Sequence, residues 1–279
     1  MTPPLPTFLI IGAMKAGTTS LAYWLGEHPD VFLAPGKELR FFNVPQRWER
    51  GVDWYRSQFA GAEGTRAIGE ATPGYLGHPR APERIASVVP GARLIALLRH
   101  PADRAYSQYW LNRAIQKEAR TFRQIIQEET SGTDLSYGFY LERGRYLKHL
   151  NELKEHFPEA AILPLLLDDL SADPAGTFAR VCAHIGVDGS VLPPNVGKVY
   201  NARSALRSRP LSHAVRMFRA RRLLSARMAG RINAWNGTTR SEPYPPMEPE
   251  IRAMLVELYE DQIPGLEQLL GRDLSSWRR

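Results

Sequence analysis

A lysine lies inside a glycine-containing segment near the start of the chain, where residues 12–18 read GAMKAGT. The glycines at positions 12 and 17 have the spacing of an ATP-binding loop. That pattern, GxxxxGK[ST], places its lysine directly after the second glycine. In this chain Thr18 holds that place, and Lys15 lies within the loop. The question is which phosphate-containing ligand would need a lysine there.

The segments on either side of this loop indicate a phosphate-binding unit. Residues 8–11 form an apolar run that predicts a buried strand, and residues 18–20 open a predicted helix that reaches about residue 27. In a strand–loop–helix unit, backbone N–H groups and the helix dipole point towards a bound anion. The candidate phosphate-binding residues are Lys15, Ala16, Gly17, Thr18, Thr19 and Ser20.

A second basic constellation follows another apolar run. Arg99 comes directly after residues 93–98, and Ser107 lies eight residues further on, in a helix predicted over residues 101–113. The guanidinium group offers planar, bidentate donors to a phosphate. A kinase or ATPase needs GK[ST] and a carboxylate at a strand end to hold Mg²⁺. The basic strand end therefore favours a nucleotide handled without metal over the alternative, a P-loop kinase-like nucleotide enzyme.

The remaining elements predict one α/β domain over residues 1–279 with a mainly parallel sheet, because predicted strands alternate with helices. Pro164 interrupts the last strand, which therefore lies at a sheet edge or begins late. Residues 30–66 look irregular. The predicted strands are 8–11, 66–69, 93–98 and 161–167, and the predicted helices are 18–27, 80–88, 101–113, 141–157, 174–185 and 248–270.

Composition narrows the class of protein and its surroundings. The 279 residues are 43% hydrophobic and carry a net charge of +7, which favours anionic partners. Cys182 is the single cysteine, so an intrachain disulfide is impossible and a reducing compartment is expected. The first residues, MTPPLPT, lack a signal pattern, and no stretch approaches the roughly 20 apolar residues of a membrane span. We expect a soluble, cytoplasmic protein.

Residues 203–232 differ from the rest of the chain because they contain nine arginines. They predict either a surface helix with a solvated face or a peripheral contact for a membrane or an acidic acceptor. Nucleic-acid binding is the third alternative, but the chain has no helix-turn-helix, zinc-finger or RRM signature. We therefore expect no nucleic-acid partner. The oligomeric state is not readable from the sequence.

Several motifs together resemble one family. GAMKAGTTSL, residues 12–21, resembles the 5′-phosphosulfate loop of sulfotransferases that use 3′-phosphoadenylyl sulfate (PAPS), and LLRHPADRAYSQY, residues 97–109, resembles their second nucleotide signature. KELRFFN at 37–43, GVDWY at 51–55 and GEATPGYL at 69–76 resemble segments of the heparan sulfate N- and 3-O-sulfotransferases. YPPM at 244–247 and the late Trp277 also fit. The resemblance covers roughly residues 7–277.

The resemblance implies a P-loop-like three-layer fold in which helices flank a central sheet, and an enzyme with PAPS as donor and 3′-phosphoadenosine 5′-phosphate (PAP) as product, without a required metal. It implies that Arg99 and Ser107 hold the 3′-phosphate of the nucleotide. Lys15 would bind the 5′-phosphosulfate and stabilise charge on the bridging oxygen as the S–O bond breaks. That role would explain the position of the lysine inside the loop.

The resemblance also implies a general base and an acceptor site. Glu38 occupies the position of the base in the heparan sulfate enzymes. The alternatives are that Glu38 is a loop residue paired with a neighbouring basic side chain, Lys37 or Arg40, or that His28, His78 or His100 is the base. The implied substrate-binding residues are Lys37, Glu70 and Tyr75. The acceptor is expected to be a small molecule, a glycan or a lipid.

Two departures from the family pattern affect the expected substrate and nucleotide contacts. Ala71 stands where the 3-O-sulfotransferases have a lysine near the active site, which puts heparan-like acceptors in doubt. Arg240 is the one candidate for the basic cluster that covers the nucleotide in the heparan enzymes. Trp24 could stack on the adenine, although a tryptophan on such a helix is more often part of the core. A relative that binds the nucleotide without catalysis is a further alternative.

Overall fold

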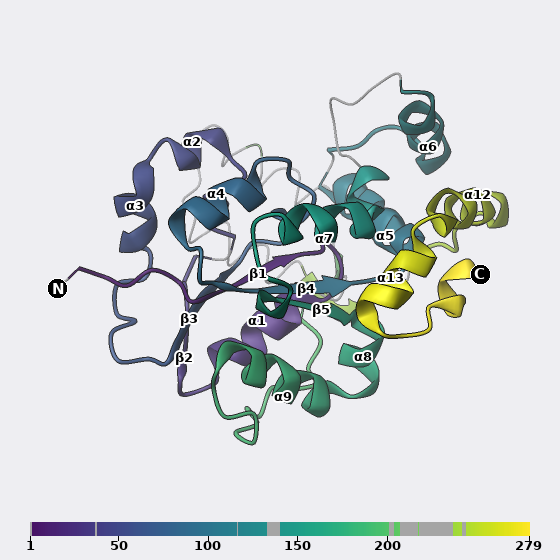
Figure 1. Ribbon diagram of the computed structural model, residues 1–279. Helices are drawn as coiled ribbons and strands as arrows, with labels where there is room; N and C mark the ends of the chain where they lie inside the picture. Colours follow the sequence, from purple (N-terminus) through teal and green to yellow (C-terminus); the bar gives the residue numbers. More distant parts are fainter. Residues whose placement is uncertain are drawn as a thin grey trace. The chain divides into compact units, whose positions relative to one another are not determined.

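Five parallel strands form the central sheet of the protein, in the order β2-β3-β1-β4-β5. The computed structural model describes residues 2–36, 38–115, 117–132, 140–200, 204–206, 217, 237–241 and 244–279 (Figure 1). The strands are β1 (Phe8–Gly12), β2 (Val31–Leu33), β3 (Ala67–Ala71), β4 (Arg93–Leu98) and β5 (Ile162–Leu166). The strands β1 and β3 are buried along their whole length, as expected for parallel strands covered on both faces.

Helices cover both faces of the sheet. Figure 1 shows α4 (Ala81–Val88) and α7 (Tyr146–Lys154) on one side, and α1 (Thr18–Gly26) and α9 (Pro174–Ile185) on the other. The predicted three-layer α/β fold is therefore confirmed. The other helices are α2 (Pro45–Trp48), α3 (Gly51–Ser57), α5 (Pro101–Ala114), α6 (Phe122–Ser131), α8 (Leu167–Ala172), α12 (Pro249–Glu260) and α13 (Ile263–Leu270), with 3-10 turns η1 (Glu142–Gly144), η2 (Glu159–Ala161) and η3 (Ser275–Arg278).

The register brings the carboxyl ends of the central strands to one edge of the sheet. Ile10 of β1 lies opposite Ala71 of β3 on one side and Ile95 of β4 on the other. Gly12, at the end of β1, lies opposite Ala96 of β4. Ligands of parallel α/β sheets bind outside the carboxyl ends of the strands. The segments that follow β1, β3 and β4 are therefore the place to look for a site.

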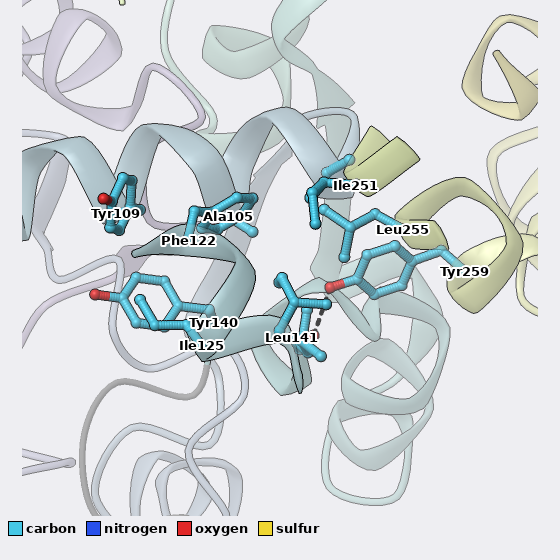
Figure 2. Packing of buried hydrophobic residues seen from close by; sticks show 11 residues of the cluster. Ala105, Tyr109, Phe122, Ile125, Tyr140, Leu141, Ile251, Leu255 and Tyr259 are labelled. Carbon is cyan, nitrogen blue, oxygen red and sulfur yellow. Dashed lines mark hydrogen bonds between the residues drawn. The ribbon is translucent and has the colours of Figure 1, made fainter. Parts of the chain in front are cut away.

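A cluster of buried hydrophobic residues packs α5 against its neighbouring elements (Figure 2). It joins residues from α5, α6 and α12 with Tyr140 and Leu141. The hydroxyl of Tyr259 in α12 donates to the backbone carbonyl of Leu141 at 2.8 Å, which ties the segment before α7 to α12 (Figure 2). Only two residues separate the end of β4 from the start of α5, and this packing fixes the helix that carries Ser107.

Two predicted helices are shorter than the sequence pattern suggests. Residues 141–157 divide into η1 and α7 because Arg145, with φ −79° and ψ 61°, leaves the helical region. Gly144 lies so close to Tyr259 that a Cβ atom would be 2.6 Å from the phenol oxygen, so tertiary packing shapes this turn. Residues 248–270 divide into α12 and α13, where Pro264 fits only the first turn of a new helix.

Two other predictions concern residues 30–66 and Pro164. Residues 30–66, predicted to be irregular, contain β2, α2 and α3, which are too short to give a clear periodic pattern. The edge position predicted for the strand with Pro164 is confirmed, since β5 is the last strand of the sheet.

The chain divides into two units: residues 1–198 with 247–279, and residues 199–246. In the second unit, β6 (Ser204–Leu206) pairs antiparallel with β7 (Gly237–Ser241). The interpretation of residues 1–279 as one domain stays a prediction. Within the described part of the chain, every helix is too short or too polar to cross a membrane.

Candidate functional site

The loop between β1 and α1 has the geometry of an anion cradle. Gly17 caps α1 in the left-handed conformation, with φ 88° and ψ 2°, and no side chain caps this helix end. Lys15 also has a positive φ, of 69°, and is half-buried. Thr18 and Ser20 are buried in the first turn, beside the half-buried Thr19. The N–H groups of a helix start point outward along its axis, where they favour a negatively charged ligand.

Gly17 is required at its position for steric as well as conformational reasons, and Gly17→Ala is expected to lower both stability and nucleotide affinity. A Cβ atom there would lie 2.8 Å from Leu167 Cδ1 and 3.2 Å from Leu170 Cδ2. Gly132→Ala is the matched control, because Gly132 has φ 71° and no atom within 4 Å of its added Cβ. Overpacking should make Gly17→Ala the more destabilising change by about 1–3 kcal/mol in denaturant unfolding. Equal losses of unfolding free energy in the two variants would show that the structure relieves the clash at position 17.

Arg99 joins the second predicted motif to this loop. Its guanidinium Nη1 donates a hydrogen bond to the backbone carbonyl of Lys15 at 3.2 Å. Its own backbone carbonyl accepts a hydrogen bond from the Tyr146 hydroxyl at 2.8 Å, which anchors the strand end. The two motifs are 84 residues apart in the sequence and meet because β1 and β4 are neighbours in the sheet.

Ser107 lies in α5 and is nearly buried. One turn before it, Arg104 is fully buried, and its guanidinium donates to Gln108 Oε1 at 2.7 Å and to the Tyr140 carbonyl. Among the described residues, none accepts a hydrogen bond from the Nε of Arg104. This arrangement places a positive charge in α5, one turn before Ser107. Phosphate contact by Ser107 stays a prediction.

Arg143 is a basic residue near the loop that sequence reasoning missed. Its guanidinium contacts the sulfur of Met14, the neighbour of Lys15. Burial, together with the positive charges of Arg104 and Arg40, lowers the pKa of Arg143 to about 10. The side chain therefore still carries its charge at neutral pH. The segment that contains Arg143 has no recognisable sequence motif. The contact is found only in the fold, where η1 lies next to the loop between β1 and α1.

Glu38 lies in a loop before α2 and forms an ion pair with Arg40. Its Oε2 lies 2.5 Å from Arg40 Nη2, and the two side chains are 30% and 56% exposed. The pairing with Arg40 that the sequence left open as an alternative is therefore seen in the structure. Exposed pairs of this kind contribute little to stability, so the carboxylate is available for other contacts. The base role of Glu38 stays a prediction, and Lys37 lies outside the described residues.

Glu70 and Tyr75 face each other inside the protein, with exposed fractions of 1% and 2%. The Glu70 carboxylate accepts hydrogen bonds from the hydroxyls of Tyr75 at 2.6 Å, Thr72 at 2.7 Å and Tyr55 at 3.0 Å. Burial raises the pKa of Glu70, and hydrogen bonds from these hydroxyls oppose that rise. The structure brings the two predicted residues together, while their contact with a substrate stays a prediction.

The three histidines considered as alternative bases have different surroundings. His28 is buried with both ring nitrogens occupied, by the Asp188 carbonyl at 3.0 Å and the Asp30 N–H at 3.1 Å, which indicates a structural role. His100 caps α5 by accepting from the Ala102 N–H, and burial lowers its pKa. Burial also lowers the pKa of the half-buried His78, which is the most exposed of the three.

The remaining expectations from the sequence concern two residues, Trp24 and Arg240, the arginine-rich segment and a metal site. Trp24 is buried and donates from Nε1 to the Lys198 carbonyl at 3.0 Å, as expected for a core residue. Arg240 lies in β7 of the second unit, and its contact with nucleotide stays a prediction. Residues 203–232 lie outside the described part except for 204–206 and 217. Where the structure describes the chain, no group of three or more His, Cys, Asp or Glu side chains is arranged to hold a metal ion.

Comparisons with known proteins agree with these motifs. A family model described as "Sulfotransferase family" matches residues 62–190. The human bifunctional heparan sulfate N-deacetylase/N-sulfotransferase 3 is 31% identical over 293 residues, covering 99% of this chain and 31% of that protein. The human heparan sulfate glucosamine 3-O-sulfotransferase 3B1 is 33% identical over 184 residues, covering 66% of this chain and 46% of that protein. The chain thus spans less than half the length of either relative.

A solved structure is similar along the entire chain. The crystal structure of a sulfotransferase from Alicyclobacillus acidocaldarius superposes with a TM-score of 0.76 and 26% sequence identity, covering 99% of this chain and 100% of that one. The match therefore extends beyond residues 62–190, the segment that the family model matches. With this fold and these relatives, the chain belongs to the sulfotransferase family.

Proposed function

We propose that the protein transfers the sulfuryl group of PAPS to a hydroxyl or amine of a small-molecule, glycan or lipid acceptor. The observation that carries the proposal is the hydrogen bond from Arg99 to the carbonyl of Lys15, at 3.2 Å. It joins the two nucleotide motifs at the carboxyl ends of neighbouring strands, where α/β proteins bind their ligands. Membership of the sulfotransferase family supports the type of reaction.

The residues at this sheet edge fit a nucleotide with two phosphate positions. They are cations, hydroxyl groups and the outward N–H groups of a helix start, all of which bind anions. In this proposal the 5′-phosphosulfate is held by Lys15, Ala16, Gly17, Thr18, Thr19 and Ser20, and the 3′-phosphate by Arg99 and Ser107. Arg240 as a nucleotide contact stays a prediction from the sequence. No metal is required, because these side chains supply the positive charge.

The bound donor supplies a sulfuryl group on a bridging oxygen that leaves with the nucleotide. Lys15 stabilises the negative charge that develops on this oxygen. Glu38 removes the proton from the acceptor. For that role the Glu38 carboxylate must exchange its pairing with Arg40 for the acceptor, which an exposed ion pair allows. Positioning the two reactants in line is the remaining task of the protein.

The acceptor is proposed only by class. The names of two relatives refer to heparan sulfate, which supports a glycan. Ala71, in place of a lysine, removes one positive charge for a sulfated glycan and supports a less acidic small molecule or lipid. Lys37 is a proposed acceptor contact, and Glu70 and Tyr75 belong to the same region. An acceptor or membrane contact through residues 203–232 and a cytoplasmic location both stay predictions from the sequence.

The proposed donor can be tested without knowing the acceptor. Calorimetric titration should show tight binding of PAP, the expected product, and no binding of ATP with Mg²⁺. A preference for ATP with Mg²⁺ would instead support the kinase-like alternative. Binding of PAP without any transfer from PAPS in an acceptor screen would support a non-catalytic nucleotide-binding relative.

Arg99→Ala is expected to weaken the affinity for PAP by about 10- to 100-fold, because a hydrogen bond to a charged phosphate contributes about 1.5–3 kcal/mol. Arg93→Ala is the matched control in the same titration. Arg93 starts the same strand and also donates to a backbone carbonyl, that of Ala160 at 2.8 Å, but at the opposite end of β4. Equal affinities of the two variants would contradict the assignment of Arg99.

A further inference from the structure

The loop that carries Glu38 is held by the segment that follows β3. Residues 38–41 run beside residues 70–75, and three of their backbone N–H groups donate hydrogen bonds there. Glu38 donates to the Ala71 carbonyl at 3.2 Å, Arg40 to Thr72 Oγ1 at 3.2 Å and Phe41 to Tyr75 Oη at 3.1 Å. Both Glu38 and Arg40 have left-handed backbone conformations, with φ 60° and 56°. Such conformations persist only where surrounding contacts impose them.

Glu70 orients the two hydroxyl groups that accept hydrogen bonds from the loop. A hydroxyl group has one proton to donate, and the hydroxyls of Thr72 and Tyr75 both donate it to the Glu70 carboxylate. Their oxygen lone pairs therefore face the loop, where they accept the N–H groups of Arg40 and Phe41. The buried carboxylate thus organises two of the three contacts, those of Arg40 and Phe41, through the hydroxyls of Thr72 and Tyr75.

We infer that Glu70, Thr72 and Tyr75 are positioning residues that hold the 38–41 loop in the conformation that presents the Glu38 carboxylate. The inference rests on the proposed function in so far as Glu38 is the base. Glu70 and Tyr75 are almost completely buried, with their polar atoms directed at each other and at the loop backbone. Their positioning role is exercised through Glu38, and it does not depend on the predicted contact of Glu70 and Tyr75 with the acceptor.

Two tyrosines provide a matched pair for the test. Tyr55 and Tyr75 are both buried, and both hydroxyls donate to the same oxygen of Glu70. Only the Tyr75 hydroxyl accepts a backbone N–H of the loop, that of Phe41. Changing either residue to phenylalanine removes one hydrogen bond from Glu70 and keeps the aromatic ring. The ring contacts of Tyr55 with Phe41, at 4.4 Å, and of Tyr75 with Phe42, at 5.3 Å, should keep both variants folded.

The first measurement is hydrogen exchange of the loop amides by NMR, which needs no acceptor. In Tyr75→Phe, the Phe41 amide should exchange at least about 10-fold faster than in the parent protein, since its acceptor is lost. In Tyr55→Phe, exchange at Leu39, Arg40 and Phe41 should stay within about twofold of the parent. Equal exchange of these amides in the two variants would overturn the inference.

The second measurement separates positioning from a purely structural role. With PAPS as donor and water as the probe acceptor, release of PAP should fall about 10- to 100-fold in kcat for Tyr75→Phe, with KM for PAPS nearly unchanged. Tyr55→Phe should stay within about twofold of the parent. Thr72→Val should behave like Tyr75→Phe, whereas Thr72→Ser, which keeps the hydroxyl, should restore turnover. Equal loss in both tyrosine variants, or no rescue by serine, would contradict the inference.

Failure of the proposed function would look different. A parent protein that neither binds PAP nor releases it from PAPS would contradict the proposed transfer reaction. The amide exchange rates would still decide whether Thr72 and Tyr75 hold the loop.

Discussion

Lys15→Ala is expected to lower kcat for sulfuryl transfer by roughly 100- to 1,000-fold, the usual effect of removing one group that stabilises developing charge. The lysine lies in the loop between β1 and α1, and Arg99 holds its backbone carbonyl at 3.2 Å. The charge that Lys15 neutralises grows as the bridging bond breaks, so its largest contribution falls in the transition state. Affinity for PAP should also weaken, but by a smaller factor than kcat. Steady-state kinetics and calorimetry of the same protein measure the two effects.

Lys154→Ala is the control for this prediction. Lys154 ends α7 and pairs with Glu159 at 3.3 Å, away from the phosphate loop, and it carries the same charge. Its loss should leave kcat unchanged. If Lys15→Ala weakens PAP binding and retains full kcat, the lysine serves in ground-state binding alone. Arg143, which contacts the neighbouring Met14, would then be the next candidate for the leaving-group role.

Glu38→Gln is expected to lower kcat by roughly 100- to 10,000-fold, the range for loss of a general base, while affinity for PAP stays near normal. Glutamine keeps the size of the side chain and its hydrogen-bonding oxygen but cannot take a proton from the acceptor. The backbone contact of residue 38 with the Ala71 carbonyl is unchanged by this substitution. The loop conformation should therefore survive, and the loss should report the chemistry.

Glu49→Gln is the matched control, since Glu49 is an exposed carboxylate at the end of α2, in the segment that follows the loop. Full turnover by Glu38→Gln would show that the base is another residue. In that event His78 should be tested before His28 and His100. His28 has both ring nitrogens occupied, and His100 caps α5.

The two halves of the proposed chemistry depend on different parts of the fold. The nucleotide residues lie at the ends of β1 and β4, whose pairing in the sheet fixes the distance between the two motifs. The proposed base lies on a loop whose backbone N–H groups donate hydrogen bonds to the segment after β3. Substitutions in the buried contacts of that loop should therefore change turnover more than nucleotide affinity, whereas substitutions at Arg99 should do the reverse.

The sequence by itself determined the sheet strands near the site and the nucleotide motifs. Residues 8–21 and 93–107 are continuous segments in which an apolar run, a turn signal and a helix start follow one another. Local rules are sufficient there, because the strand, the glycine and the first helical turn are adjacent in the chain. The missing N–H of proline, a local property, left two outcomes for the strand with Pro164, and the sheet order shows that the edge position is the correct one.

Only the tertiary structure decided which distant groups meet. The contact of Arg143 with Met14 joins residues 129 positions apart, and no local pattern encodes it. The same holds for Glu70 and Tyr75, which the family resemblance implied as substrate-binding residues. Their contacts with the 38–41 loop, about 30 residues away, follow from the packing of that loop against the segment after β3. Local patterns specify which backbone conformations are favoured, but the partners of buried polar groups are set by how the elements pack, because each such group must find its hydrogen bond within the fold.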